Sequence, residues 1–279
     1  MAIARDKFWM FGVRAHQDDI WLAQTCGRPM EDRDRVWSRI TPAEGAFMLD
    51  TPNMLMINCD GIPVPFSQDA YGYAESFKRL NKVMWGVTGS GGFRVGNEEK
   101  FICTLAEKYP NISGAFMDDI FGKFTKLPED ERVGKCAAFL KDIRDGLDKA
   151  SRPMELYTVW YTHEMWAAVP EIFDMIDGVS MWTWHCEELP QMKERFEILE
   201  KTFPKHKKFL GVYMYDFPSR KPVPLDLMEL QCEYGLELLK AGRLDGMIFE
   251  ANSVMGVGLP SEKWLTEWVD KVKNTVVPD

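Results

Sequence analysis

A single (β/α)8 barrel, an α/β fold, is the architecture that this sequence predicts. Short apolar segments alternate with amphipathic stretches along the chain, and turn residues separate them. The chain has 279 residues, close to the typical barrel length of about 250 residues. We therefore expect residues 1–279 to form one barrel domain. The reactive groups of such a barrel lie in the loops that follow the carboxyl ends of its strands.

Each predicted element follows from local pattern and turn chemistry. The apolar segments predicted as strands are Phe8–Arg14, Asn53–Asn58, Val83–Thr88, Ile112–Asp118, Leu156–Trp160, Gly178–Trp184, Phe209–Tyr215 and Gly246–Glu250. The amphipathic stretches predicted as helices are Glu98–Lys108, Glu129–Lys149, Leu189–Thr202, Leu225–Lys240 and Ser261–Lys273. Thr41 followed by Pro42 and Glu44 predicts a further helix start. Two long loops, His16–Asp34 and Asp60–Ala70, follow the first two strands, where function is expected.

Composition narrows the class of partner. The net charge of −9 argues against nucleic acid, which selects for basic surfaces. No apolar run approaches the roughly 20 residues that span a bilayer, so no membrane partner is expected. Because Met1–Lys7 leads directly into the first strand, we expect a cytoplasmic protein, or a secreted one if a signal peptide has been removed. The six cysteines, Cys26 among them, show no CxxC spacing and are expected to be reduced.

Side-chain alternation predicts which residues enter the barrel. We assign the large apolar residues of each strand to the helix-facing side and the opposite parity to the interior. The predicted inward residues at the strand ends are Arg14, His16, Asn58, Asp60, Thr88, Asp118, Trp160, Trp182, Trp184, Tyr213, Tyr215 and Glu250. Hydrogen-bonding groups and flat rings together suit a sugar, whose hydroxyls need polar partners while its C–H faces stack on aromatics. The aromatic residues could alternatively only fill the barrel mouth.

Two positions carry the predicted chemistry. Asp118 and Asp119 directly follow the fourth strand, where unpaired acids are costly, although an aspartate there can also cap a turn. Glu250 ends the eighth strand, and two carboxylates across a sugar are what glycoside hydrolysis needs. Glu250 could instead only pair with Arg14. The predicted substrate-binding residues are Arg14, His16, Asn58, Asp60, Trp160, Trp182, Trp184, Tyr213, Tyr215 and Asp216, with Asp60 and Asp216 as substitute acids.

With the Phe116–Asp119 stretch and the tryptophans of its strand ends, the chain resembles the broad group of (β/α)8-barrel glycoside hydrolases. Several families of that group carry a catalytic Asp after strand four. The resemblance implies a carbohydrate hydrolase that needs no cofactor. The Glu pair of the largest clan is absent, since Asp118 follows strand four and Tyr215-Asp216 follow strand seven.

Other classes share parts of this pattern. The chain is also similar to metal-dependent sugar isomerases and epimerases, in which Asp118 or Asp119, Glu164, His185 and Glu250 would hold Mn²⁺ or Mg²⁺. Outward parity of His185 argues against that set, and we expect metal-independent chemistry. Ala15–Asp19 is similar to the Ala-His-Pro-Asp-Asp motif of zinc-dependent sugar de-N-acetylases, but Gln17 replaces the proline and no histidine pair has zinc-ligand spacing. A non-catalytic carbohydrate-binding barrel is the third alternative.

Overall fold

The structure is a computed structural model, and it describes residues 1–25 and 37–279. Eight parallel strands close into a barrel in which β11 pairs back onto β2, as the sequence predicts. These strands are β2 (Phe8–Gly12), β3 (Asn53–Met56), β4 (Lys82–Thr88), β5 (Ile112–Met117), β6 (Glu155–Trp160), β7 (Gly178–Met181), β8 (Lys207–Tyr213) and β11 (Gly246–Glu250). Every predicted strand is present, so the predicted fold class is confirmed.

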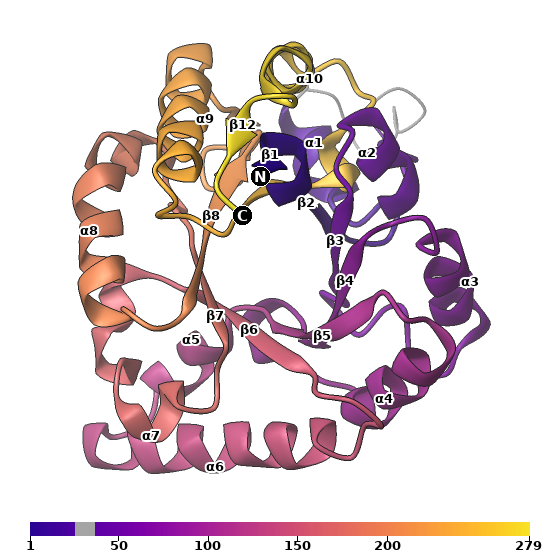
Figure 1. Ribbon diagram of the computed structural model, residues 1–279, viewed down its shortest axis with the longest axis vertical. Helices are drawn as coiled ribbons and strands as arrows, with labels where there is room; N and C mark the ends of the chain where they lie inside the picture. Colours follow the sequence, from indigo (N-terminus) through magenta and orange to yellow (C-terminus); the bar gives the residue numbers. More distant parts are fainter. Residues whose placement is uncertain (26–36) are drawn as a thin grey trace. The chain divides into compact units, whose positions relative to one another are not determined.

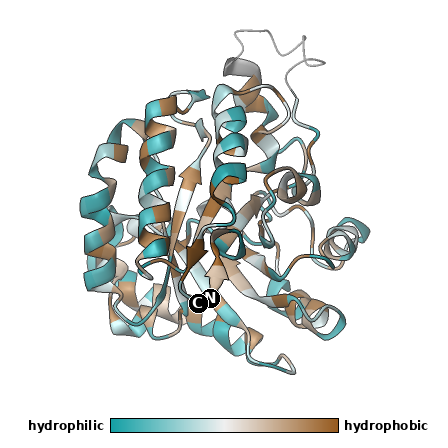
Figure 2. Cartoon of the chain, turned by 45° about the horizontal axis from the view of Figure 1, so that its top comes forward, coloured by the Kyte–Doolittle hydropathy of each residue, from teal (hydrophilic) through white to brown (hydrophobic). Residues whose placement is uncertain are grey.

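Helices follow the strands along the chain (Figure 1). They are α1 (Asp19–Thr25), α2 (Pro42–Met48), α3 (Gln68–Ser76), α4 (Glu98–Lys108), α5 (Ile120–Thr125), α6 (Glu129–Leu147), α7 (Pro170–Phe173), α8 (Met192–Thr202), α9 (Leu225–Lys240) and α10 (Pro260–Val272). Two short antiparallel pairs join β1 (Ala2–Ile3) to β12 (Val276–Val277) and β9 (Tyr215–Asp216) to β10 (Lys221–Pro222). Hydrophobic residues gather on the strands, whereas the helices carry both kinds of residue (Figure 2). Each helix can therefore bury one face and leave the other in water.

The predicted helix start at Thr41 is confirmed. The Thr41 hydroxyl accepts a hydrogen bond from the Glu44 backbone N–H at 3.3 Å, and the Glu44 carboxylate accepts one from the Thr41 N–H at 2.8 Å. Pro42 occupies the first helical position, where its missing N–H costs nothing. This capping box fixes the beginning of α2.

Contacts divide the chain into two compact units. The first comprises Met1–Met54, Trp182–Phe196 and Phe209–Asp279, and the second Leu55–Met181 and Glu197–Lys208. In the first unit, Phe8 packs edge-on against Phe249 with ring centroids 5.2 Å apart. In the second, Trp85 packs edge-on against Phe101 of α4 at 5.6 Å. Aromatic side chains thus fill the space between strands and helices in both units.

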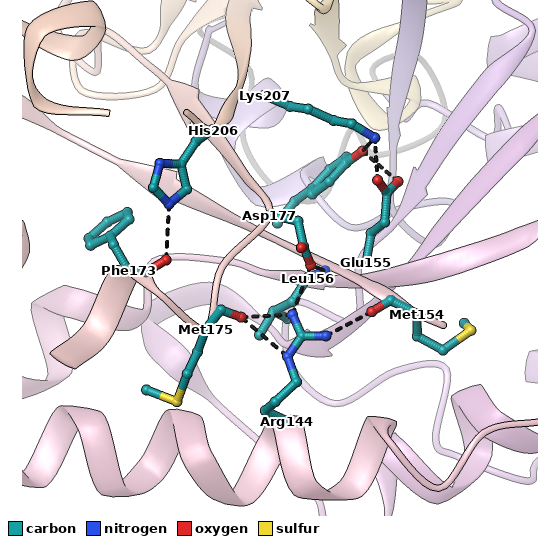
Figure 3. Close-up of polar contacts among 10 residues, drawn as sticks. Arg144, Met154, Glu155, Leu156, Phe173, Met175, Asp177, His206 and Lys207 are labelled. Atoms are coloured by element: carbon teal, nitrogen blue, oxygen red, sulfur yellow. Dashed lines mark hydrogen bonds and ion pairs between the residues drawn. The ribbon is translucent and has the colours of Figure 1, made fainter. Parts of the chain in front are cut away.

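Charged groups at the amino ends of the strands are paired in the second unit (Figure 3). Lys207, the first residue of β8, forms an ion pair with Glu155, the first residue of β6. Close by, Arg144 of α6 contacts Asp177 at 2.8 Å and donates to the Met175 carbonyl at 2.7 Å. These contacts tie the beginnings of β6, β7 and β8 together.

Candidate active site at the carboxyl ends of the strands

Strand register shows which side chains enter the barrel, and it corrects two predicted parities. The first concerns β2. Phe11 lies in register with Glu250 of β11 and contacts Trp182 edge-on at 5.6 Å, whereas Phe8 faces Trp268 of α10. Trp9 and Phe11 therefore point inward. The parity assumed for β2 was therefore wrong, because here large apolar residues fill the interior; Arg14 lies two residues beyond the end of the strand, and its orientation stays a prediction.

The second correction concerns β6. Trp160 is fully buried, lies in register with Met181 and packs edge-on against Phe203 at 5.1 Å, on the helix-facing side. Thr158 shares that side. Tyr157, in register with Phe116 and Gly178, faces the interior instead. The predicted inward orientation of Trp160 was wrong, and this ring is not placed to contact a substrate.

The parity predicted for the other strands agrees with their packing. Trp85 of β4 contacts α3 and α4 rings, so Gly86 faces inward, as does its register partner Phe116 of β5. In the first unit, Phe249 of β11 packs against Trp268 of α10, which leaves Ile248 and Glu250 on the inward side. Asp118, two residues beyond inward-facing Phe116, and Glu250, the last residue of β11, therefore both have the inward parity.

Asp118 is a buried acid of the second unit. Its side chain is only 7% exposed. Burial, and then the charge of Asp119, raise the pKa of Asp118 well above its usual value of 3.8. Thr88, at the end of the neighbouring strand β4, accepts a hydrogen bond from the Asp118 N–H at 2.9 Å and donates to its carbonyl oxygen at 3.1 Å. The backbone of Asp118 is therefore fixed, and burial of its carboxyl group favours the protonated form.

Asp119 has surroundings of a different kind. It adopts a left-handed backbone conformation with φ of 44° at the start of α5. Burial raises the pKa of Asp119, but a hydrogen bond from the Tyr161 side chain and the nearby imidazole of His163 lower it. The Tyr161 and His163 rings stack with centroids 5.3 Å apart and planes 14° apart. The two adjacent carboxyl groups thus have unequal environments. Such a difference can let one carboxyl group act as an acid while its neighbour acts as a base.

Glu164 is a third acid of this cluster. The sequence had suggested it only as one ligand of the alternative metal site. It lies in the 3-10 helix η4 (Thr162–Ala167), is 4% exposed and accepts a hydrogen bond from the Tyr161 N–H at 3.0 Å. Burial first, and then the charge of Asp119, raise the pKa of Glu164 to about 7, against the lowering effect of the Tyr161 N–H. Its position four residues beyond β6 was the available sequence signal.

Asn58 lies two residues beyond β3 and is 1% exposed. A Cβ atom on inward-facing Gly86 would lie 2.6 Å from the Asn58 Oδ1, so the amide group lies over Gly86 on the interior side. Neither amide atom has a hydrogen-bond partner within the described part of the chain. Asn58, Thr88 and Asp118 thus follow three adjacent strands, as predicted.

Aromatic rings form a connected cluster in the first unit. Trp182 meets Tyr213 edge-on at 5.0 Å, and Trp184 stacks on Phe217 with planes 2° apart and centroids 5.9 Å apart. Trp184 is 41% exposed, whereas Trp182 is 3% exposed and lies directly over Gly211, where a Cβ atom would fall 2.0 Å from the indole. Trp184 and the edge of Tyr213 are the parts of this cluster that a ligand can reach.

Tyr215 differs from Trp182, Trp184 and Tyr213, the neighbouring aromatic residues that were also predicted to bind a sugar. Its side chain is completely buried, its hydroxyl donates to the Trp21 carbonyl oxygen at 3.0 Å, and its ring packs against Phe217 at 5.1 Å. Tyr215 lies in the β9–β10 pair beyond the end of β8. Tyr215 therefore packs against Phe217 and has no exposed face for a sugar.

The other predicted site residues are dispersed over the strand ends. Glu250 is half-buried and lies in register between Tyr213 and Phe11. Arg14 is half-buried and donates to the Gln17 side chain at 2.8 Å. The His16 imidazole is 46% exposed and contacts Asp19 at 3.1 Å. The loop His16–Asp34 lies partly outside the described residues.

Asp60 and Asp216, the predicted substitute acids, differ in burial. Asp60 is exposed. Asp216 is 4% exposed, and one of its carboxylate oxygens accepts hydrogen bonds from the Cys186 thiol at 3.2 Å and from the Ser219 hydroxyl. A buried acid that already holds two donors is suited to fixing the β9–β10 turn.

The predicted metal ligands do not come together as a set. Over residues 1–25 and 37–279 there is no group of three or more His, Cys, Asp or Glu side chains arranged to hold a metal ion. His185 is exposed at the start of the 3-10 helix η5 (Cys186–Gln191). The set Asp118 or Asp119, Glu164, His185 and Glu250 therefore does not form a ligand cage.

Two further predictions concern the oxidation state of the cysteines and the absence of a membrane-spanning helix. The described cysteines, Cys59, Cys103, Cys136, Cys186 and Cys232, are free thiols. Cys26 lies outside the described residues. Among the described helices, none is both long and apolar enough to cross a membrane.

Comparison with known proteins finds similar folds among solved structures. No protein-family model matches the chain, and no curated protein matches it. Among solved structures it is similar to an alpha-L-arabinofuranosidase from Thermotoga maritima, with a TM-score of 0.62, 12% identity, and coverage of 96% of this chain and 71% of that one. It is similar to an endo-alpha-mannosidase from Bacteroides thetaiotaomicron, with a TM-score of 0.57, 10% identity, and coverage of 96% and 97%.

An endo-glycoceramidase II from Rhodococcus sp. matches with a TM-score of 0.57 and 10% identity, covering 98% of this chain and 80% of that one. The resemblance to the broad group of (β/α)8-barrel glycoside hydrolases is therefore confirmed at the level of the fold, and no single family of that group is indicated. Because one barrel hosts many reactions, the function has to be argued from the side chains.

Proposed function

We propose that this protein is a glycoside hydrolase in which Asp118 donates a proton to the leaving oxygen of the scissile bond. The unequal environments of Asp118 and Asp119 carry this proposal. Asp118 is buried, fixed through its backbone to Thr88 and placed at the end of β5, and burial raises the pKa of its carboxyl group and so favours the protonated form. Glycosidases need one carboxyl group in that state.

The reaction also needs an ionised carboxylate that attacks the sugar or activates water. We propose Glu250 for this role, with Asp119 as the alternative. Glu250 is half-buried at the end of β11, so its carboxyl group keeps contact with solvent. Burial raises the pKa of Asp119 above its usual value, and the Tyr161 side chain and His163 offset part of that effect.

Trp184 and Tyr213 are proposed to stack on the sugar. Trp184 exposes 41% of its surface, and a flat ring of that kind offers a large apolar contact to the C–H face of a pyranose. Arg14, His16, Asp60 and Asp216 remain predicted substrate contacts, while Trp160 and Tyr215 are removed from that set because of their packing.

Hydrolysis of a panel of 4-methylumbelliferyl glycosides, followed by a glycan library, tests the proposal. The wild-type protein should release product from at least one substrate, and Asp118→Asn should reduce the rate by orders of magnitude. Asp69→Asn, a change on the exposed face of α3, is the matched control and should leave the rate unchanged. Binding without turnover would instead support a non-catalytic carbohydrate-binding barrel.

A further inference from the structure

Asn58 differs from the other buried asparagines in the use of its amide group. The amide of Asn53 donates to the backbone carbonyls of Asp6 and Phe8 at 3.0 and 2.9 Å. The amide of Asn252 likewise bonds to both backbone groups of Val13. Asn58 is as deeply buried as either of them, yet its Nδ2 and Oδ1 have no partner in the described chain.

A buried amide without partners lowers stability. Each buried polar group that is left unsatisfied keeps its desolvation penalty, and Asn58 leaves both a donor and an acceptor in this state. The surrounding backbone is shaped around it, since a Cβ atom on Gly86 would fall 2.6 Å from Oδ1 and one on Gly89 2.2 Å from the Asn58 carbonyl oxygen. An apolar residue of similar size would avoid the cost, so the amide group has no structural justification.

We infer that Asn58 is a specificity-determining residue that recognises two neighbouring hydroxyls of the sugar, one accepting from Nδ2 and the other donating to Oδ1. The inference rests on the proposed function for the identity of the ligand as a sugar. Its geometric basis is independent: Asn58 follows β3, Thr88 ends β4, and Asp118 follows β5, on adjacent strands. A ring held by Asn58 would therefore lie on the same edge of the sheet as the proposed proton donor.

The first test measures stability without any ligand. Asn58→Leu keeps the approximate shape and removes the unpaired polar atoms, so it should raise the thermal midpoint by a few degrees. Asn53→Leu, at an equally buried site on β3, should lower the midpoint, because it leaves two backbone carbonyls without donors. A midpoint for Asn58→Leu that falls as it does for Asn53→Leu would identify a structural amide and overturn the inference.

The second test measures binding by ligand-observed NMR. A panel of methyl glycosides, with the deoxy analogues of each, is titrated into wild-type protein and Asn58→Leu. A glycoside that binds the wild type should lose affinity about tenfold or more in Asn58→Leu, and the two deoxy analogues that lack the paired hydroxyls should bind both proteins equally weakly. Equal affinity of the parent glycoside for both proteins would overturn the inference.

The two tests separate this inference from the proposed function. If glycosides bind through Asn58 but no substrate is turned over, the specificity role stands and the hydrolase proposal fails. If substrates are hydrolysed and Asn58→Leu hydrolyses them with unchanged KM, the hydrolase proposal stands and the role of Asn58 is refuted.

Discussion

The Thr88 hydroxyl is bonded twice to the backbone of Asp118, accepting from its N–H at 2.9 Å and donating to its carbonyl oxygen at 3.1 Å. Both residues are buried. This reciprocal pair lies where the ladder between β4 and β5 ends, and it replaces the missing backbone hydrogen bonds. It also fixes the strand end that carries the proposed proton donor.

Thr88→Val should therefore destabilise the protein. The two side chains have similar shapes, but valine leaves the buried Asp118 N–H without an acceptor, which costs about 1–3 kcal/mol. Urea denaturation would measure the free energy of unfolding. Thr88→Ser keeps the hydroxyl and should lie closer to wild type; equal losses in both variants would show that methyl packing matters more than the bonds.

Asp118→Asn should stabilise the protein at pH 8 while abolishing turnover. Because burial holds the folded-state pKa of Asp118 well above its usual value, the folded state binds the proton more tightly than the unfolded state. The stability contributed by that proton is present at low pH and is lost as the pH rises through the folded-state pKa. Denaturation at pH 5 and pH 8 should show a smaller loss in the variant than in wild type. A variant less stable than wild type at pH 8 would contradict a strained, buried carboxylate.

Glu164→Gln should flatten the same pH profile around neutrality. The pKa of Glu164 is raised from 4.5 to about 7, so protonation favours the folded state, and its stabilising effect disappears between about pH 4.5 and pH 7. A rise of this size corresponds to at most about 3 kcal/mol. Burial also raises the pKa of Asp18 to about 6, which acts in the same direction, so the difference between wild type and Glu164→Gln is the quantity to measure.

Trp182 and Trp184 should respond differently to truncation. Trp184→Ala removes a 41% exposed ring and should weaken glycoside binding with little effect on stability. Trp182→Ala leaves a cavity at a buried site and should lower the free energy of unfolding by about 3–5 kcal/mol. Gly211→Ala should also destabilise, since its Cβ would meet the indole of Trp182 at 2.0 Å. Isothermal titration calorimetry with a glycoside that binds the wild type measures the loss of affinity, and urea denaturation measures the loss of stability. Unchanged affinity in Trp184→Ala would show that Trp184 does not contact the glycoside.

Glu250→Gln tests the second carboxylate. The substitution removes a charge at nearly constant shape and should reduce kcat by orders of magnitude on any substrate that the glycoside panel identifies, if Glu250 attacks the sugar or activates water. The same measurement on Asp119→Asn distinguishes the alternative. Near-wild-type turnover in Glu250→Gln together with an inactive Asp119→Asn would transfer the role to Asp119.

The sequence pattern predicted every barrel strand, because alternation of apolar strands and amphipathic helices is a local property of the chain. Orientation was harder to predict. The assumption that large apolar side chains face the helices failed for β2 and β6, where Phe11 and Tyr157 fill the interior and Trp160 faces outward. Side-chain size does not distinguish the two layers when both are filled with aromatic rings; only the register with neighbouring strands does.

The sequence could predict which acids lie at the candidate site, but it predicted less of what surrounds each acid. Asp118 and Asp119 were predicted from their position directly after a buried strand. The burial of Glu164 depends on the 3-10 turn of η4, which has no apolar periodicity. The unpartnered amide of Asn58 depends on the tertiary contacts of β3 and β4, which no local pattern records.

Strand β6 begins with Glu155, which forms an ion pair with Lys207 (Figure 3). It is followed by Glu164, whose carboxyl group is buried near Asp119. If the acids around Glu164 carry the proposed activity, selection for folding and selection for activity act on opposite ends of the same strand. Random mutagenesis should separate them: changes near Glu155 should be recovered as losses of expression, and changes near Glu164 as soluble protein with altered activity. For redesign, the amino-terminal ends of the strands can be held constant while the loops at the carboxyl ends are diversified.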